Sequence, residues 1–223
     1  MNDQTSSASP TSLSQYHNRL LSRHVDLLPL NRELVSGVEF FKSEVNKLFH
    51  PEARVPDQSN FLDAISRVLN QSNEERPTLE NLRKVNQALT GEDSELRSAQ
   101  EGPLFGNYAV TPPDRIERAL GRFFEWVVSD GYQDLHPIEQ MAIGQIRLLE
   151  IHPFLRFSRL TGDIFSYSFL VKADYLLPSY SKSDLENLDH LIEEGLGFST
   201  SGLVKLHLGA CKRSYQRALE GLA

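Results

Sequence analysis

The 223-residue sequence contains a single cysteine, Cys211, which excludes an intrachain disulfide framework and a cysteine-rich metal site. No stretch approaches the roughly 18 uninterrupted apolar residues that a membrane-spanning helix requires. The first residues also lack the order of a cationic and then an apolar segment that is typical of a secretory signal peptide. We therefore expect a cytoplasmic protein that does not contact the membrane.

An excess of basic residues is absent as well. Lys and Arg number 23 against 30 Asp and Glu, so the formal net charge is −7. A general nucleic-acid binder needs a basic face that displaces counterions from phosphates, and nucleic acid is therefore not an expected partner. A hydrophobic content of 39% is sufficient for a core in a chain of this length.

Apolar residues recur at helical spacing along most of the chain, which predicts an all-α fold. Gly91 follows one helical pattern at a position where glycine often ends a helix. Pro137 suits the first position of another helix, and Ser183 with Glu186 has the spacing of a capping box. Helices are expected over about residues 34–48, 61–69, 79–89, 114–129, 137–151, 161–175, 183–194 and 201–222.

Three parts are expected along the chain. Residues 1–15 are polar and predict a disordered tail, because they have too little apolar area to offset the entropy of ordering. Residues 16–76 are expected to form an N-terminal helical extension, and residues 77–223 a core with the C-terminal helices. The irregular stretch 91–113 has many turn signals, and a loop of that length is typical of a functional segment.

The segment LHPIEQMAIGQIRLLEIHPFLRFSRLTG carries the strongest functional signal. An amphipathic helix leads into His-Pro-Phe at 152–154, then a short polar loop, then a second apolar helix. This arrangement resembles the Fic family (the Fic/Doc fold), whose signature is His-Pro-Phe-x-(Asp/Glu)-Gly-Asn-(Gly/Lys)-Arg between two helices. The resemblance extends over about residues 77–178. It implies a Fic-like helical bundle with a short β-hairpin flap formed by Leu104, Phe105, Gly106, Asn107 and Tyr108.

The resemblance also implies a chemistry, from which this sequence departs. In the family the histidine, here His152, is the general base that activates a hydroxyl group of the target. AMP is then transferred from ATP, bound with Mg²⁺, to that hydroxyl. Arg156 stands in place of the acidic metal ligand, so we expect no metal and no ATP–Mg²⁺ cofactor. The remaining replacements are Phe157 and Arg159 for glycine or lysine, Ser158 for asparagine, and Leu160 and Asp163 for arginines that grip phosphates.

The residues that remain predict a re-purposed site. An imidazole such as His152 suits general-base chemistry near neutral pH. Arg156 and Arg159 add two cations beside His152, at the start of the next helix, where free N–H groups favour anions. The first hypothesis is therefore a diverged Fic-like enzyme that acts on an anionic small molecule or protein. Its expected substrate-binding residues are Arg156, Ser158, Arg159, Thr161 and Gly162.

Two other functions stay open. One is a catalytically inactive scaffold that binds an extended peptide through its flap by strand addition. The other is residual adenylyl, nucleotidyl or phosphoryl transfer. The alternative interpretation of His152 is a buried structural histidine at a helix end. The family's inhibitory pattern, (Ser/Thr)-x-x-x-Glu-(Gly/Asn), is one residue short at 98–102. The sequence leaves open whether the chain forms a homodimer.

Overall fold

The structure is a computed structural model that describes residues 10–22, 56–70, 76–102 and 108–221. Over these residues it is helical and contains no β-strand, so the expected all-α class is confirmed. The elements are α1 (Pro10–Leu21), α4 (Gln58–Leu69), α5 (Leu79–Thr90), the 3₁₀ turn η1 (Pro113–Arg115), α6 (Ile116–Val127), α7 (Asp130–Gln133), α8 (Pro137–Ile151), α9 (Ser158–Lys172), α10 (Lys182–Leu196) and α11 (Ser201–Gly221).

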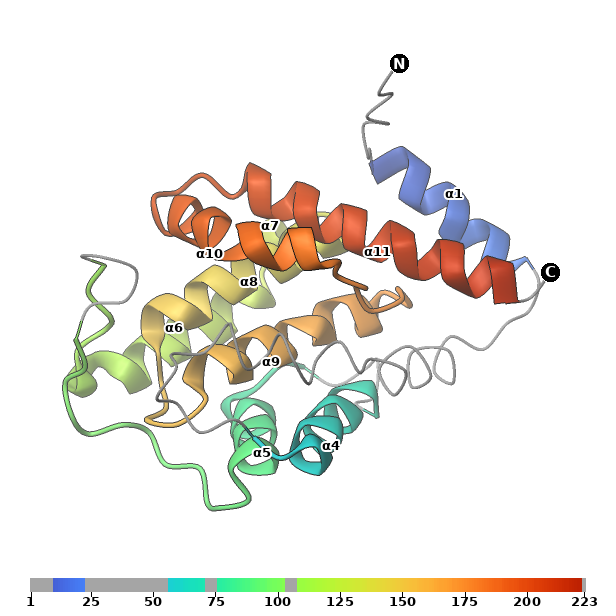
Figure 1. The fold of residues 1–223 in the computed structure, drawn as a ribbon. Coiled ribbons are helices and arrows are strands. Elements are labelled where there is room, and N and C mark those ends of the chain that lie inside the picture. The colour runs from blue at the N-terminus through green and yellow to red at the C-terminus, as the bar shows by residue number, and fades with distance from the viewer. Residues whose placement is uncertain (1–9, 23–55, 71–75, 103–107, 222–223) are drawn as a thin grey trace.

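The helices α8 and α9 lie at the centre of the bundle (Figure 1). The pair α4 and α5 packs against α9 on one side of the bundle. The pair α10 and α11 packs against α8 on the other side. Both central helices are apolar around most of their circumference, as expected of helices with no face toward water. Gly144 lets them approach closely, because a Cβ atom there would lie 2.7 Å from the Phe169 ring.

Local signals explain most helix ends. Thr78 caps α5 by accepting a hydrogen bond from the Asn81 N–H, and Gly91 ends that helix in the left-handed region at φ 70°. The cap of α10 differs from the expected pair at Ser183 and Glu186. The box is formed by Ser181 and Asp184 instead. Asp184 is also paired with Arg213 of α11, a tertiary contact that favours the earlier start.

The expected tail boundary at residue 15 is wrong, because α1 begins at Pro10. Leu13 is fully buried, and the His17 ring stacks on Tyr175 with centroids 4.6 Å apart. The His17 Nδ1 also lies 2.8 Å from the Tyr215 hydroxyl on α11. Packing on α11 therefore stabilises a helix that its composition alone did not predict. Residues 1–9 and the helix expected over 34–48 lie outside the described residues.

The expected flap is described only at its end. Leu104, Phe105, Gly106 and Asn107 lie outside the described residues, whereas the Tyr108 hydroxyl donates to Glu150 Oε1 at 2.6 Å. No hairpin is present in the ranges that are described, where Leu96 and Phe154 form an isolated antiparallel bridge. The helix α9 starts at Ser158, three residues before the expected position, so the α8–α9 turn is only residues 152–157. No described helix is both long and apolar enough to cross a membrane.

Candidate functional site

The predicted general base lies in the turn between α8 and α9. His152 ends α8 with φ 46°, and Phe157 precedes α9 with φ 53°, so both adopt the left-handed backbone conformation. This conformation is uncommon for residues other than glycine and is often retained at functional sites. The His152 N–H still donates to the Leu148 carbonyl at 2.9 Å, which fixes the residue at the helix end.

The His152 ring is buried against a carboxylate from the loop that follows α5. Its Nε2 lies 2.8 Å from Glu101 Oε2, and its side chain is 11% exposed. Burial, assisted by the charge of Arg97, lowers the pKa of His152 to about 4, while burial raises the pKa of Glu101. With Glu101 ionised, the ring proton sits on Nε2. The buried Nδ1 then has a lone pair and no hydrogen-bond partner among the described residues.

Arg97 connects this loop to the end of α8. The Arg97 N–H donates to the Pro153 carbonyl at 2.9 Å, next to the bridge between Leu96 and Phe154. Its guanidinium, only 4% exposed as a residue, donates to the His152 carbonyl at 2.6 Å. Neither Arg97 nor Glu101 was assigned a role from the sequence. The signal that could have found Glu101 was the incomplete inhibitory pattern at 98–102.

Asn86 of α5 holds the same turn from its other side. Its Nδ2 donates to the Arg156 carbonyl at 2.8 Å and to Thr161 Oγ1 at 2.9 Å. Its Oδ1 accepts a hydrogen bond from the Ser94 hydroxyl at 2.7 Å. Asn86 was not predicted to belong to the site from the sequence. A buried amide inside the apolar face of a helix was the available signal, because such a group needs hydrogen-bond partners.

Three of the predicted substrate-binding residues lie in the first turns of α9, and two of them bond to the 152–157 turn. Ser158 Oγ accepts from the Phe154 N–H at 3.1 Å, and the Thr161 hydroxyl donates to the Phe157 carbonyl at 2.8 Å. Ser158 is 4% exposed, Thr161 is fully buried, and Gly162 beside them is buried. Their contact with a substrate stays a prediction, and in this arrangement Ser158 and Thr161 stabilise the turn.

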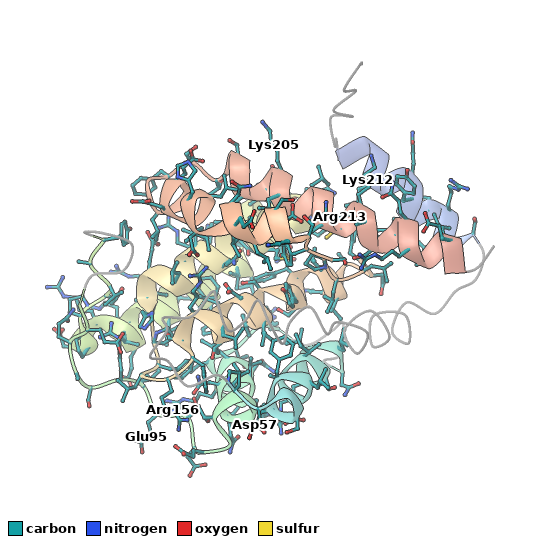
Figure 2. All side chains as sticks on the ribbon, in the orientation of Figure 1. Asp57, Glu95, Arg156, Lys205, Lys212 and Arg213 are labelled. Atoms are coloured by element: carbon teal, nitrogen blue, oxygen red, sulfur yellow. The ribbon has the colours of Figure 1, made fainter. Side chains whose placement is uncertain are left out.

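The two predicted cations are each paired with an acid from outside the turn. Arg156 lies at the outer edge of the molecule beside α5 (Figure 2), with its Nη1 3.0 Å from Glu92 Oε2. Arg159 Nη2 lies 2.6 Å from Asp189 Oδ1 of α10. The acids are 70% and 53% exposed at their side chains. The imidazole of His152 is thus engaged by Glu101, while each arginine is held by a surface carboxylate.

Asp163 belongs to a buried chain of hydrogen bonds, which we call the His207 chain (Asp163, Gln145, His207 and Tyr180). Gln145 Nε2 donates to Asp163 Oδ1 at 2.7 Å, and Gln145 Oε1 lies 2.9 Å from His207 Nε2. The Tyr180 hydroxyl lies 2.8 Å from His207 Nδ1. Burial raises the pKa of Asp163 and lowers the pKa of His207 to about 3, so the histidine is neutral.

The residues at the turn do not fit a magnesium–triphosphate group. Mg²⁺ prefers carboxylate oxygens, but the acidic position of the signature holds Arg156. Over the described ranges no group of three or more His, Cys, Asp or Glu side chains is arranged to hold a metal ion. The phenyl ring of Phe157 fills the place of a glycine, and an anion, Asp163, stands where a cation would grip phosphate.

Comparisons with known proteins agree with the fold. No family model matches the chain. The protein adenylyltransferase Fic of Drosophila grimshawi is 25% identical over 126 residues, which is 53% of this chain and 26% of that protein. The chain thus spans about a fifth to a quarter of the length of such curated relatives.

Solved structures extend the similarity to nearly the whole chain. Fic-1 from C. elegans superposes with a TM-score of 0.69 at 13% identity, covering 95% of this chain and 71% of that one. The IbpA Fic2 structure in complex with adenylylated Cdc42 gives a TM-score of 0.55 at 14% identity, with 94% and 71% covered. The arrangement of helices around the His152 turn, together with these similarities, shows that this chain is a Fic-fold protein.

Proposed function

We propose that the chain is a diverged Fic-fold enzyme in which His152 takes a proton from a nucleophilic group of the substrate. We further propose that ATP–Mg²⁺-dependent AMP transfer is not its reaction. The observation that carries the proposal is the pairing of a neutral, buried imidazole with the Glu101 carboxylate at 2.8 Å in a left-handed turn. Strained, half-satisfied histidines of this kind are found at functional sites more often than in ordinary cores.

The proton transfer follows from this pairing. The substrate X–H group, a hydroxyl, amine or carbon acid, gives its proton to the imidazole and keeps the electron pair of the broken X–H bond. The imidazolium that forms is stabilised by the adjacent Glu101 carboxylate, as in other histidine–carboxylate pairs. Because the pKa of His152 is lowered to about 4, the base is unprotonated above about pH 5, and its availability is constant from there upward.

An anionic group on the substrate would be bound by Arg156 and Arg159. The pair between Arg156 and Glu92 is exposed on both sides, and such pairs contribute only about 0–1 kcal/mol, so a ligand phosphate or carboxylate can displace Glu92. Arg159 is 13% exposed and lies near both Asp189 and Asp163, so a ligand would have to compete with two carboxylates there. A protein substrate is supported by the structural neighbour that was solved with adenylylated Cdc42.

Chemical modification tests the base directly. Diethyl pyrocarbonate acylates unprotonated imidazole nitrogens, and peptide mass spectrometry locates the product. We expect His152 to be modified at pH 6 at its unpaired Nδ1, slowly because that atom is buried, while His207, whose two nitrogens are both hydrogen-bonded, is not modified. The expected protection of His152 by inorganic phosphate or pyrophosphate would link the base to the anion site. An unreactive His152 in the folded protein would overturn the proposed role.

Thermal unfolding with ligands tests the second half of the proposal. We expect pyrophosphate to raise the Tm of the wild type but not of an Arg156→Gln/Arg159→Gln double variant, and we expect Mg²⁺ to add nothing to the effect of ATP. A Mg²⁺-dependent rise with ATP, together with transfer of label from α-labelled ATP to protein, would instead establish nucleotidyl transfer.

One observation favours a second function, a binding scaffold that transfers nothing. In the structure Glu101 occupies the Nε2 of His152, and both arginines are already neutralised. Such a scaffold would keep its cellular phenotype in a His152→Asn variant, whereas the enzyme would lose it.

A further inference from the structure

Arg97 is a buried cation that is surrounded by carbonyl oxygens. Its Nε donates to the His152 carbonyl at 2.6 Å and its Nη1 to the Ala99 carbonyl at 3.0 Å. Its Nη2 donates to the Thr111 carbonyl and reaches the Ile151 carbonyl at 3.4 Å. Over the described residues no carboxylate lies within 4.0 Å of its guanidinium nitrogens. A buried charge without such a partner depends on these main-chain contacts.

Two of these acceptors are at the C-terminal end of α8. The last carbonyls of a helix have no intrahelical donor and carry the negative end of the helix dipole, so a cation there is doubly favourable. Glycine is the usual residue at such an end, but here His152 adopts the left-handed conformation with φ 46°. Hydrogen bonds from Arg97 to Ile151 and His152 stabilise that conformation, which a β-carbon disfavours.

Arg97 also places the carboxylate that meets the ring. Its own N–H donates to the Pro153 carbonyl at 2.9 Å, so the segment 96–101 runs along the turn. Four residues after Arg97, the Glu101 carboxylate reaches His152 Nε2. The same guanidinium therefore contacts the main chain of His152 and that of Ala99, which lies two residues before Glu101.

We propose that Arg97 is a positioning residue that builds the His152 site: it holds the histidine in the left-handed conformation at the end of α8 and holds Glu101 against its ring. The proposal rests on the proposed function of His152 only for its catalytic consequence. The structural consequence, a fixed and neutral imidazole, is measurable without any reaction. Arg97 and Glu101 are the charged groups that act on this ring from the described elements.

The test measures the titration of His152 by NMR in Arg97→Met, with the signal assigned by its loss in His152→Asn. Because burial and the Arg97 charge lower the pKa of His152, removal of the charge is expected to shift that pKa upward from about 4 toward its ordinary value. Arg147→Met is the matched control. Arg147 lies in the last turn of the same helix but is 44% exposed and paired with Glu150, so we expect no shift.

Arg97→Lys separates position from charge. Lysine keeps the charge but cannot reach four carbonyls at once, so the pKa of His152 should stay low while its ring signal broadens or splits. An unchanged His152 titration in Arg97→Met would overturn the proposal. A sharp, single His152 signal at the wild-type chemical shift in Arg97→Lys would also overturn the proposal. This second variant keeps the proposal testable if Arg97→Met does not fold. A shifted pKa, combined with a His152→Asn variant that retains its phenotype, would refute the enzyme but keep the positioning role.

Discussion

His152 and His207 are both buried and neutral, but they differ in the hydrogen-bond partners of their rings and in their backbone conformation. In the His207 chain, both ring nitrogens are hydrogen-bonded to amide or phenol groups, and the residue lies within a regular helix. His152 has one nitrogen against a carboxylate, the other without a partner among the described residues, and a left-handed backbone. A fully paired histidine is typical of a structural role, whereas the half-paired one retains capacity for chemistry.

The largest expected effect tests the structural half of this comparison. His207→Phe keeps the volume but leaves the Gln145 carbonyl buried without a partner and removes one partner of the Tyr180 hydroxyl, which also bonds Tyr167. We expect the free energy of unfolding in urea to fall by about 1–3 kcal/mol, the cost of one unpaired buried group. His190→Ala is the control, because its side chain is 71% exposed and should change stability by about 0.5 kcal/mol or less. A loss below 1 kcal/mol for His207→Phe would show that the chain contributes little.

The pH dependence of stability tests what the two histidines share. The pKa of His152 is lowered to about 4 and that of His207 to about 3, whereas both are near 6.5 in the unfolded chain. Below pH 6.5 the unfolded state therefore binds more protons, and the stability present above that pH is lost as pH falls toward 4. Each histidine contributes a slope of about 1.4 kcal/mol per pH unit in this window.

Urea unfolding at several pH values would measure that slope. We expect it to become shallower in His207→Phe and in His152→Asn. The lowered pKa values of His17 and His136 leave part of the slope in place in both variants. An unchanged slope in either variant would mean that the replaced histidine is protonated in the folded protein.

The variant His152→Asn tests how the two sites differ. Asparagine tolerates the left-handed conformation at position 152, so the loss is confined to the pairing with Glu101. We expect the free energy of unfolding to fall by about 1 kcal/mol, the value of one hydrogen bond, while any His152-dependent activity is abolished. A destabilisation as large as that of His207→Phe would place both histidines in the same structural class.

The smallest effect is expected at Arg156, whose side chain is in contact with solvent. The pair between Arg156 and Glu92 has side chains that are 38% and 70% exposed. Arg156→Gln should therefore change the free energy of unfolding by about 0.5 kcal/mol or less, and high salt should erase the difference. A larger, salt-independent loss would show that Arg156 belongs to the framework of the turn and not to a ligand-binding surface.

Much of the fold could be predicted from neighbouring residues alone. The helices that became α5, α6, α8 and α11 were expected within a few residues of their observed bounds, because apolar periodicity and caps such as Thr78 and Gly91 are local. The start of α1 was missed, since Leu13 and His17 are ordered by contacts with residues near 175 and 215. The cap of α10 was displaced by two residues for the same reason, through Arg213.

The candidate site was predicted less completely than the fold. The sequence singled out His152 and its turn, but it did not reveal Glu101, Arg97 or Asn86 as the groups that hold them. These partners are 51, 55 and 66 residues away from His152 along the chain, and no local pattern encodes such pairing. The expectation of two available cations likewise could not foresee that Glu92 and Asp189 would neutralise them.

By itself, the sequence determined that this protein is helical, that a histidine follows its central apolar helix, and that the metal-binding and phosphate-gripping residues of the resembling family are replaced. Each of these depends on residue identity and short-range spacing. Only the tertiary structure decided the state of that histidine. Charge, proton position and burial depend on which side chains meet in space, and here a carboxylate and a guanidinium from a distant loop set all three.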